Sequence, residues 1–107
     1  MKVDHVAIQV DDIYEACGWY KAAFDAKMLY HDDTWAILEL ANIKLALVLT
    51  NHHKNHLAVE IDPQKYPNLT FKKHRDGSHY HYLIDPWGNC VELIDYGRNS
   101  SKNLKIE

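Results

Sequence analysis

Apolar and polar residues alternate with a period of two along most of the chain, the pattern of strands that bury one face of a sheet. In segment 3–10 the even positions hold Asp4 and three apolar residues, while His5 falls on the opposite, smaller and more polar face. Further segments of this kind predict strands at 28–31, 35–40, 43–49, 56–61, 69–74, 79–84 and 90–96. Turn-forming residues join them at Ala41-Asn42, Asp76-Gly77 and 85–89.

One segment has the period of a helix instead. Asp12 is suited to the N-cap position and Glu15 stands three residues later, the spacing of a capping box. Apolar residues then recur at intervals of three and four as far as about Asp25, and they form one stripe: Ile13, Ala16, Cys17, Tyr20, Ala23 and Phe24. We expect this stripe to pack against the sheet.

The order of elements repeats along the chain. Residues 1–50 predict a strand, a helix and three strands, and residues 54–96 predict a second set of four strands. Where the first half has its helix, the second has only the short, proline-broken stretch 62–68. The expected fold is α+β: a single domain, 1–107, of two βαβββ modules, the second lacking most of its helix, followed by a frayed tail at 97–107.

Composition narrows the class of protein. With 47% hydrophobic and 25% charged residues, the 107-residue chain is typical of a globular domain. A net charge of −3 gives no reason to expect a nucleic-acid partner, and no apolar run is long enough to cross a membrane. The first residues lead directly into a strand, and two cysteines are too few for a disulfide framework, so we expect a cytoplasmic protein.

Eight histidines are unusual for this length, and two of them open corresponding strands of the two halves. His5 and His56 each occupy a strand position opposite the more apolar set, and so does Glu92 on the last strand. A polar side chain on a buried face is costly unless something compensates it, and a divalent ion is the simplest compensation. These three residues are therefore the candidate metal ligands.

Four segments carry a resemblance to a known family: 4–10, the helix with Trp19-Tyr20, 56–59, and 82–93 with its Asp-Pro-Trp-Gly-Asn turn. Over residues 2–96 the chain resembles the vicinal oxygen chelate superfamily, which includes glyoxalase I, fosfomycin-resistance thiol transferases, extradiol dioxygenases and bleomycin-resistance proteins. The resemblance implies a cupped mixed sheet whose concave face holds a divalent ion. The ion could be zinc, manganese, nickel or iron.

By position the family's four ligands correspond to His5, a residue near Ala46, His56 and Glu92. Ala46 cannot bind a metal, and Glu39 is a candidate replacement, although pairing with a neighbouring cation explains it better. The resemblance also places Tyr82 on the cup side, where it could hydrogen-bond a substrate or act as a general acid, or simply pack.

Other polar residues have a structural as well as a functional interpretation. Tyr80 shares the face of Tyr82, Lys44 could contact an anion but is more simply a solvated lysine, and Cys90 shares a face with Glu92. Four histidines are expected to bind no metal: His79 and His81 on an uncovered sheet face, and His52 and His53 in a loop. Cys17 is expected to be a packing residue.

The resemblance implies a metal-dependent enzyme acting on a small molecule that chelates through vicinal oxygens, by lyase, isomerase, thiol-transfer or dioxygenase chemistry. The alternative is a non-catalytic binding or antibiotic-resistance protein of the same fold. The outer strand faces of 57–61 and 91–93 lack a covering helix, which predicts a homodimer. In such a dimer we expect His5 of one chain to join His56 and Glu92 of the other.

Overall fold

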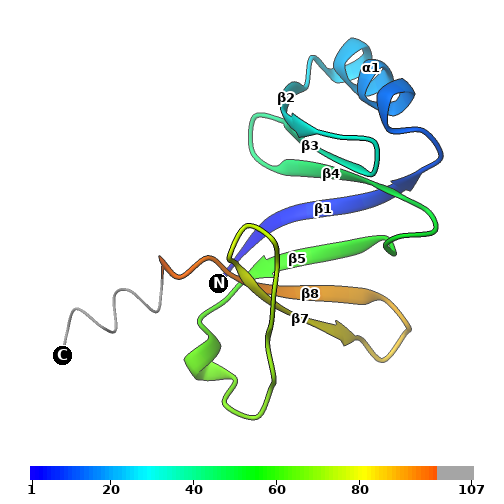
Figure 1. The fold of residues 1–107 in the computed structure, drawn as a ribbon. Coiled ribbons are helices and arrows are strands. Elements are labelled where there is room, and N and C mark those ends of the chain that lie inside the picture. The colour runs from blue at the N-terminus through cyan, green and yellow to red at the C-terminus, as the bar shows by residue number, and fades with distance from the viewer. Residues whose placement is uncertain (99–107) are drawn as a thin grey trace.

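The computed structural model describes residues 1–98 and shows one open mixed sheet of eight strands with a single α-helix (Figure 1). The predicted α+β class and the loss of the second module's helix are confirmed. The elements are β1 (Lys2–Val10), α1 (Ile13–Phe24), β2 (Lys27–His31), β3 (Trp35–Glu39), β4 (Lys44–Leu49), β5 (His56–Glu60), the short 3-10 helix η1 (Pro63–Lys65), β6 (Lys72–Lys73), β7 (His79–Ile84) and β8 (Cys90–Asp95). No helix within residues 1–98 is long and apolar enough to span a membrane.

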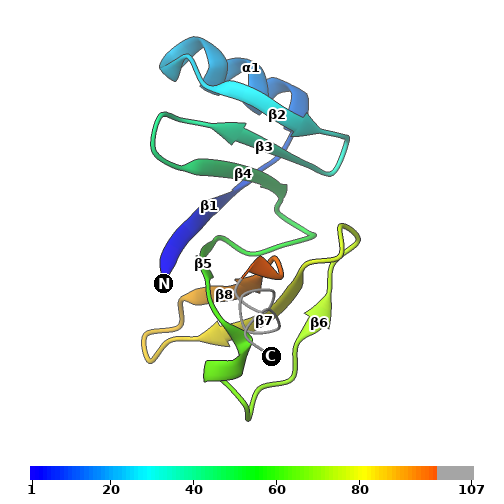
Figure 2. The same cartoon turned by 90° about the vertical axis from the view of Figure 1, so that its left-hand side faces the viewer.

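The repeat is visible in the order of strands, β2-β3-β4-β1-β5-β8-β7-β6. In each half the first strand pairs in parallel with the last, β1 with β4 and β5 with β8. The two halves meet where β1 and β5 run antiparallel at the centre of the sheet. Figure 2 shows the first half stacked above the second, with the sheet curving between them. Residues on β1, β5 and β8 are therefore close in space although they come from both ends of the chain.

The helix α1 begins and ends at residues that cap it. Asp12 accepts a hydrogen bond from the backbone N–H of Glu15 at 3.0 Å, and Asp25 ends the helix in a left-handed conformation, φ 54°. The apolar stripe of α1 packs on the outer face of β3 and β4, where Leu38 and Leu47 are fully buried. Cys17 lies in this core, as predicted.

The second half differs from the prediction in two respects. The expected strand 69–74 is reduced to Lys72–Lys73, because the backbone N–H of Leu69 closes a turn onto Tyr66 and cannot pair in a ladder. The segment that replaces the helix also covers part of the outer face. Thr70 accepts a hydrogen bond from His81, the partner of Leu93 in the sheet register.

That segment makes the uncovered apolar face smaller than predicted. Ile61 and Leu93 are buried, whereas Leu57 is exposed. The expected frayed tail lies outside the described residues from position 99 onward.

Candidate metal centre

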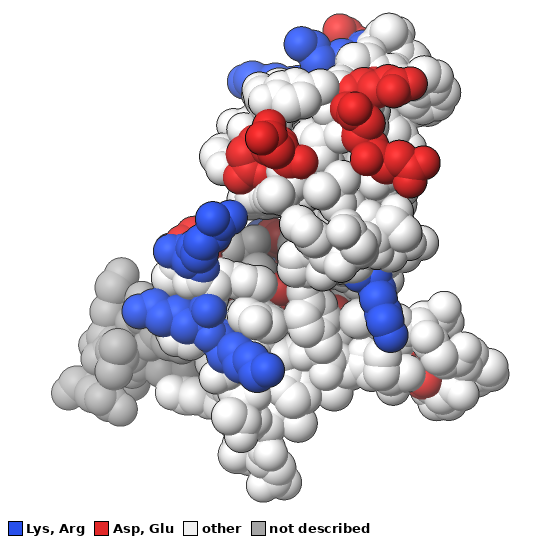
Figure 3. Space-filling view, turned by 45° about the vertical axis from the view of Figure 1, so that its right-hand side comes forward, with Lys and Arg blue, Asp and Glu red and all other residues white. Residues whose placement is uncertain are grey.

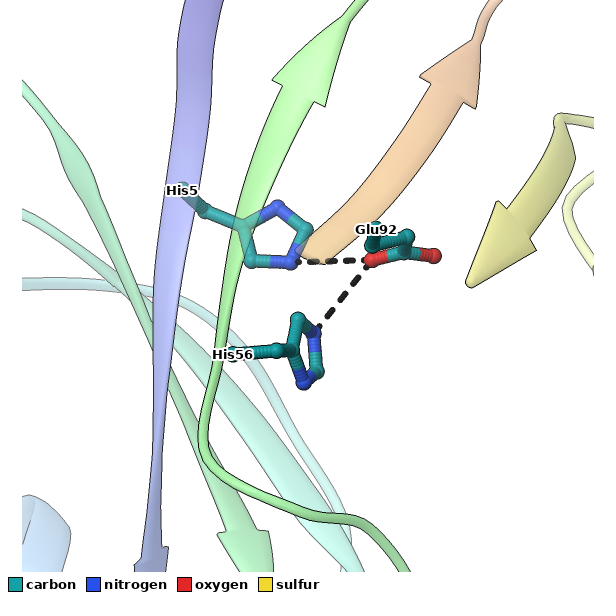
Figure 4. A group of neighbouring side chains, drawn as sticks. All are labelled: His5, His56 and Glu92. Carbon is teal, nitrogen blue, oxygen red and sulfur yellow. Dashed lines mark ion pairs between the residues drawn. The ribbon is translucent and has the colours of Figure 1, made fainter. Parts of the chain in front are cut away.

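Three neighbouring strands bring the predicted ligands together. In the sheet register His5 pairs with Ala58 on β5, and Ala58 pairs in turn with Glu92 on β8. His56 pairs with Ala7, two residues from His5 on the same face. Figure 4 shows the three side chains pointing toward one another from β1, β5 and β8. The period of two along each strand therefore put the three side chains on one face of the sheet.

The three side chains have the spacing of metal ligands. The Oε1 atom of Glu92 lies 3.5 Å from Nε2 of His5 and 3.3 Å from Nε2 of His56. One donor atom from each of the three residues lies within 4.8 Å of the others. Only 9%, 9% and 2% of His5, His56 and Glu92 are exposed. Among residues 1–98 this is the group with the donor set and spacing for a divalent ion.

The second nitrogen of each imidazole has a hydrogen-bond acceptor. Nδ1 of His5 lies 2.7 Å from Oδ2 of Asp4, and Nδ1 of His56 lies 2.8 Å from the carbonyl oxygen of Lys54. A carbonyl or carboxylate oxygen only accepts, so each Nδ1 donates, and each ring in its neutral form can present the Nε2 lone pair to an ion at the centre. This arrangement is typical of metal-binding histidines. The donor set therefore fits a divalent ion.

Asp4 is not where the alternation predicted. It was expected on the helix-facing side, but β1 has a bulge between Val3 and His5 that turns the Asp4 side chain toward the site. Its Oδ2 also accepts a 2.6 Å hydrogen bond from the Tyr96 hydroxyl. Burial alone would raise the pKa of Asp4, but the hydrogen bonds from His5 and Tyr96 outweigh it and lower that pKa.

Charge is concentrated in this small volume. Burial alone would lower the pKa of His5, but the hydrogen bonds and charges of Asp4 and Glu92 raise it to about 9. Burial would likewise raise the pKa of Glu92, whereas its histidine neighbours hold it well below the usual range.

Sequence reasoning missed His74 as a site residue. Its Nε2 lies 2.7 Å from Oε2 of Glu92, on the side of the carboxylate away from His5 and His56. The available signal was the predicted turn at Asp76-Gly77. A hairpin there puts His74 on the same face as Tyr80, because the period of two continues from Lys72, which pairs with Tyr80.

A cavity of about 950 Å³ opens from the three ligands. Tyr82 lines it, with its ring edge-on to His56 at 5.6 Å between centroids. Burial, and then the charge of Glu92, raise the pKa of Tyr82, so its phenol stays protonated at neutral pH. Tyr82 can therefore donate a hydrogen bond but cannot serve as a base.

The rest of the cavity wall is partly basic. Lys44, Lys73 and Arg75 line it, and the last two make no ion pair within residues 1–98. Figure 3 shows one face of the molecule, with acidic side chains gathered in its upper part and basic ones both at its upper end and in its lower half. Lys44 is not simply solvated, because its Nζ lies 4.0 Å from Oδ1 of Asp4.

Other candidates lie outside the centre. Ala46 is buried in a small apolar cluster with Ala7 and Val48. Glu39, the candidate replacement for a fourth ligand, is exposed at the end of β3 and lies outside the ligand group. Cys90 neighbours His56 in the register but is not in the group either.

The remaining histidines follow the structural interpretation. His79 is exposed, and His81 binds the Thr70 carbonyl. His52 and His53 are exposed loop residues at the edge of the cavity. His5 was expected to join the ligands of a second chain, but one chain already brings all three residues together.

No protein-family model matches the sequence, and no curated protein matches it. Several solved structures do match the fold. Methylmalonyl-CoA epimerase from Mycobacterium tuberculosis is 16% identical, with a TM-score of 0.66 over 94% of this chain and 91% of that one. The epimerase from Streptomyces coelicolor is 13% identical, with a TM-score of 0.67 over 92% and 96%.

A glyoxalase/bleomycin resistance protein/dioxygenase superfamily member from Vibrio splendidus 12B01 also matches, at 10% identity and a TM-score of 0.66 over 88% of this chain and 99% of that one. The chain has the vicinal oxygen chelate fold. In this fold the two modules place β1, β5 and β8 side by side, so the position of the candidate centre follows from the topology. At identities this low, the structural matches establish the vicinal oxygen chelate fold alone. The activity has to be argued from the residues of the site.

Proposed function

We propose that this protein is a divalent-metal-dependent enzyme acting on a small molecule that binds through vicinal oxygens. The observation that carries the proposal is the pair of hydrogen bonds at Nδ1 of His5 and His56. Histidines placed only for packing have no need to present two lone pairs and a carboxylate oxygen to one point. Metal ligands are oriented in this way by their outer partners.

The residues present support substrate binding beside the ion. Two imidazoles and one carboxylate leave open positions for external oxygens, where a divalent ion supplies electrostatic stabilisation of negative charge. Tyr82 faces the same cavity with a protonated phenol, suited to hydrogen-bond a substrate oxygen. Trp35, Ile37 and Val48 form an apolar part of the cavity wall. Lyase, isomerase, thiol-transfer and dioxygenase chemistry all fit this arrangement.

The structural neighbours bear on the size of the substrate. Two of the matching epimerase structures contain methylmalonyl-CoA and 2-nitronate-propionyl-CoA, according to their descriptions. The cavity of this chain, at about 950 Å³, is within the range that holds a ligand of drug size. We propose a small-molecule substrate, with no nucleic acid or membrane partner.

A second candidate is a non-catalytic binding protein of the same fold. The observation that favours it is Ala46, a buried apolar residue at the position where the family resemblance implies a fourth ligand. A binding protein needs the cavity but not the ion. The two functions therefore differ in whether metal is bound at one equivalent per chain.

Metal analysis separates the candidates. The protein, purified without a polyhistidine tag, is expected to bind one equivalent of zinc, manganese or cobalt. His56→Ala should abolish this, and His79→Ala, which removes an exposed histidine, should not. Acetohydroxamate, a small vicinal-oxygen chelator, should then perturb the visible spectrum of the cobalt form. A wild-type protein that holds no metal at equilibrium would contradict the enzyme assignment and leave the binding protein.

We also propose a cytoplasmic homodimer. Leu57, Leu83 and Ile84 are apolar and exposed on the second half of the sheet or at its end, and such side chains are commonly covered in an assembly. A chain of 12.5 kDa would then sediment at twice that mass. A single 12.5 kDa species in sedimentation equilibrium at micromolar concentration would exclude the dimer.

A further inference from the structure

The two oxygens of Glu92 have different surroundings. Oε1 faces Nε2 of His5 and of His56, at 3.5 and 3.3 Å. Oε2 lies 2.7 Å from Nε2 of His74, which approaches from the opposite side. One oxygen of the carboxylate thus faces the candidate metal centre, and the other faces a third histidine that is outside the ligand group.

His74 is itself held on several sides. It follows β6, where its backbone N–H donates to the carbonyl of Ser78 at 2.8 Å and its own carbonyl accepts from Gly77 at 3.0 Å. Gly77 has φ 91°, a conformation that glycine adopts without strain. The imidazole stacks on the ring of Tyr80, at 3.8 Å between centroids and 16° between planes. The turn fixes the backbone of His74, and the stack fixes its ring.

Such restraint has a consequence for the carboxylate. A ligating carboxylate can bind an ion through one oxygen or through both, and a hydrogen bond to one oxygen favours binding through the other. We infer that His74 is a positioning residue of the metal centre: its Nε2–H holds Oε2 of Glu92, so that Oε1 alone is presented to the ion. This inference rests on the proposed metal-dependent function.

The inference also explains how the site can work without a fourth ligand at Ala46. Two imidazoles and a carboxylate bound through one oxygen occupy three positions, which leaves the others for substrate. His74 fixes the orientation of the Glu92 carboxylate without itself occupying a position on the ion. The turn at Gly77 fixes His74, and His74 holds one oxygen of Glu92. In this way the turn helps to determine how many positions on the ion stay open.

Metal affinity tests the role of His74. Affinities for zinc and cobalt would be measured by competition with a chromophoric chelator for wild type, His74→Ala and His74→Gln, with His79→Ala as the matched control. His79 is exposed and does not line the cavity. We expect the affinity of His74→Ala to fall about 10- to 100-fold with one equivalent still bound. His74→Gln, whose amide can donate the same hydrogen bond, should recover most of the loss, and His79→Ala should match wild type.

X-ray absorption of the zinc forms distinguishes positioning from direct ligation. Wild type and His74→Ala should both show two imidazoles, and the carboxylate should change from one bound oxygen to two in the variant. Loss of an imidazole in His74→Ala would make His74 a ligand and overturn the inference, as would an affinity equal to that of wild type. Wild type that binds no metal would instead refute the proposed function itself.

A second pair of variants tests the stack without changing the histidine. Tyr80→Phe keeps an aromatic face under His74 and should bind metal as wild type does, whereas Tyr80→Ala should bind more weakly. Unfolding midpoints of all metal-free variants would show whether each is folded. Equal affinities for the two Tyr80 variants would contradict the role given to the stack.

Discussion

Replacing Asp4 by asparagine tests whether the outer partners of the ligands matter. The change preserves shape but removes the negative charge that faces Nδ1 of His5 at 2.7 Å. Asp4 is deeply buried, with 6% of its side chain exposed, so solvent cannot replace the lost charge. In Asp4→Asn the amide nitrogen would take the place of Oδ1. It would then face the ammonium group of Lys44, whose Nζ lies 4.0 Å from Oδ1 of Asp4.

The expected magnitude follows from these contacts. Charge-assisted hydrogen bonds are about twice as strong as neutral ones, and loss of an outer partner typically weakens metal binding about 10- to 100-fold. Asp4→Asn should therefore lose about 1.4 to 2.7 kcal/mol of metal-binding free energy. Tyr96→Phe, which removes only the neighbouring 2.6 Å hydrogen bond to Asp4, should lose less.

Titration calorimetry with zinc measures the difference directly. Asp11→Asn is the matched control, since Asp11 is an exposed residue just beyond the same strand. An Asp4→Asn affinity within twofold of wild type would refute the reasoning, because it would mean that the carboxylate does not orient His5. A loss equal to that of Asp11→Asn would lead to the same conclusion.

Three further predictions concern the core, the acid stability and the substrate side of the cavity. Leu47→Ala should lower the free energy of unfolding by about 2–5 kcal/mol in a denaturant titration, because Leu47 is fully buried under α1; a loss below about 1 kcal/mol would contradict this packing. The ion pair with Arg98 lowers the pKa of Glu60, so the stability it contributes is present above the ordinary carboxylate pKa of about 4.5 and is lost as the pH falls through the lower folded-state value. Unfolding of Glu60→Gln should thus depend less on pH in the acid range than that of wild type, and equal slopes would exclude this contribution. Tyr82→Phe should leave metal affinity unchanged and lower kcat about 10²-fold on any substrate found, whereas unchanged kcat would assign Tyr82 to packing.

The sequence by itself determined most of the elements and the common face of the three candidate ligands. Alternation in the strands fixes which side chains share a face, so His5, His56 and Glu92 could be assigned to one surface before any coordinates were known. The capping residue Asp12 and the apolar stripe behind it likewise determined the helix. Both signals are local, since they depend on the backbone period of a single segment.

Tertiary structure decided the contacts that break that period or join distant segments. The bulge in β1 arises from its pairing with β5, and it moved Asp4 from the predicted face to the site. His74 reaches Glu92 across 18 positions of sequence, through a turn and a ring stack that pairing of β6 with β7 creates. Strand pairing, which depends on two segments at once, therefore set the outer partners of the candidate centre, whereas the period of each strand alone was sufficient to predict the face of its candidate ligand.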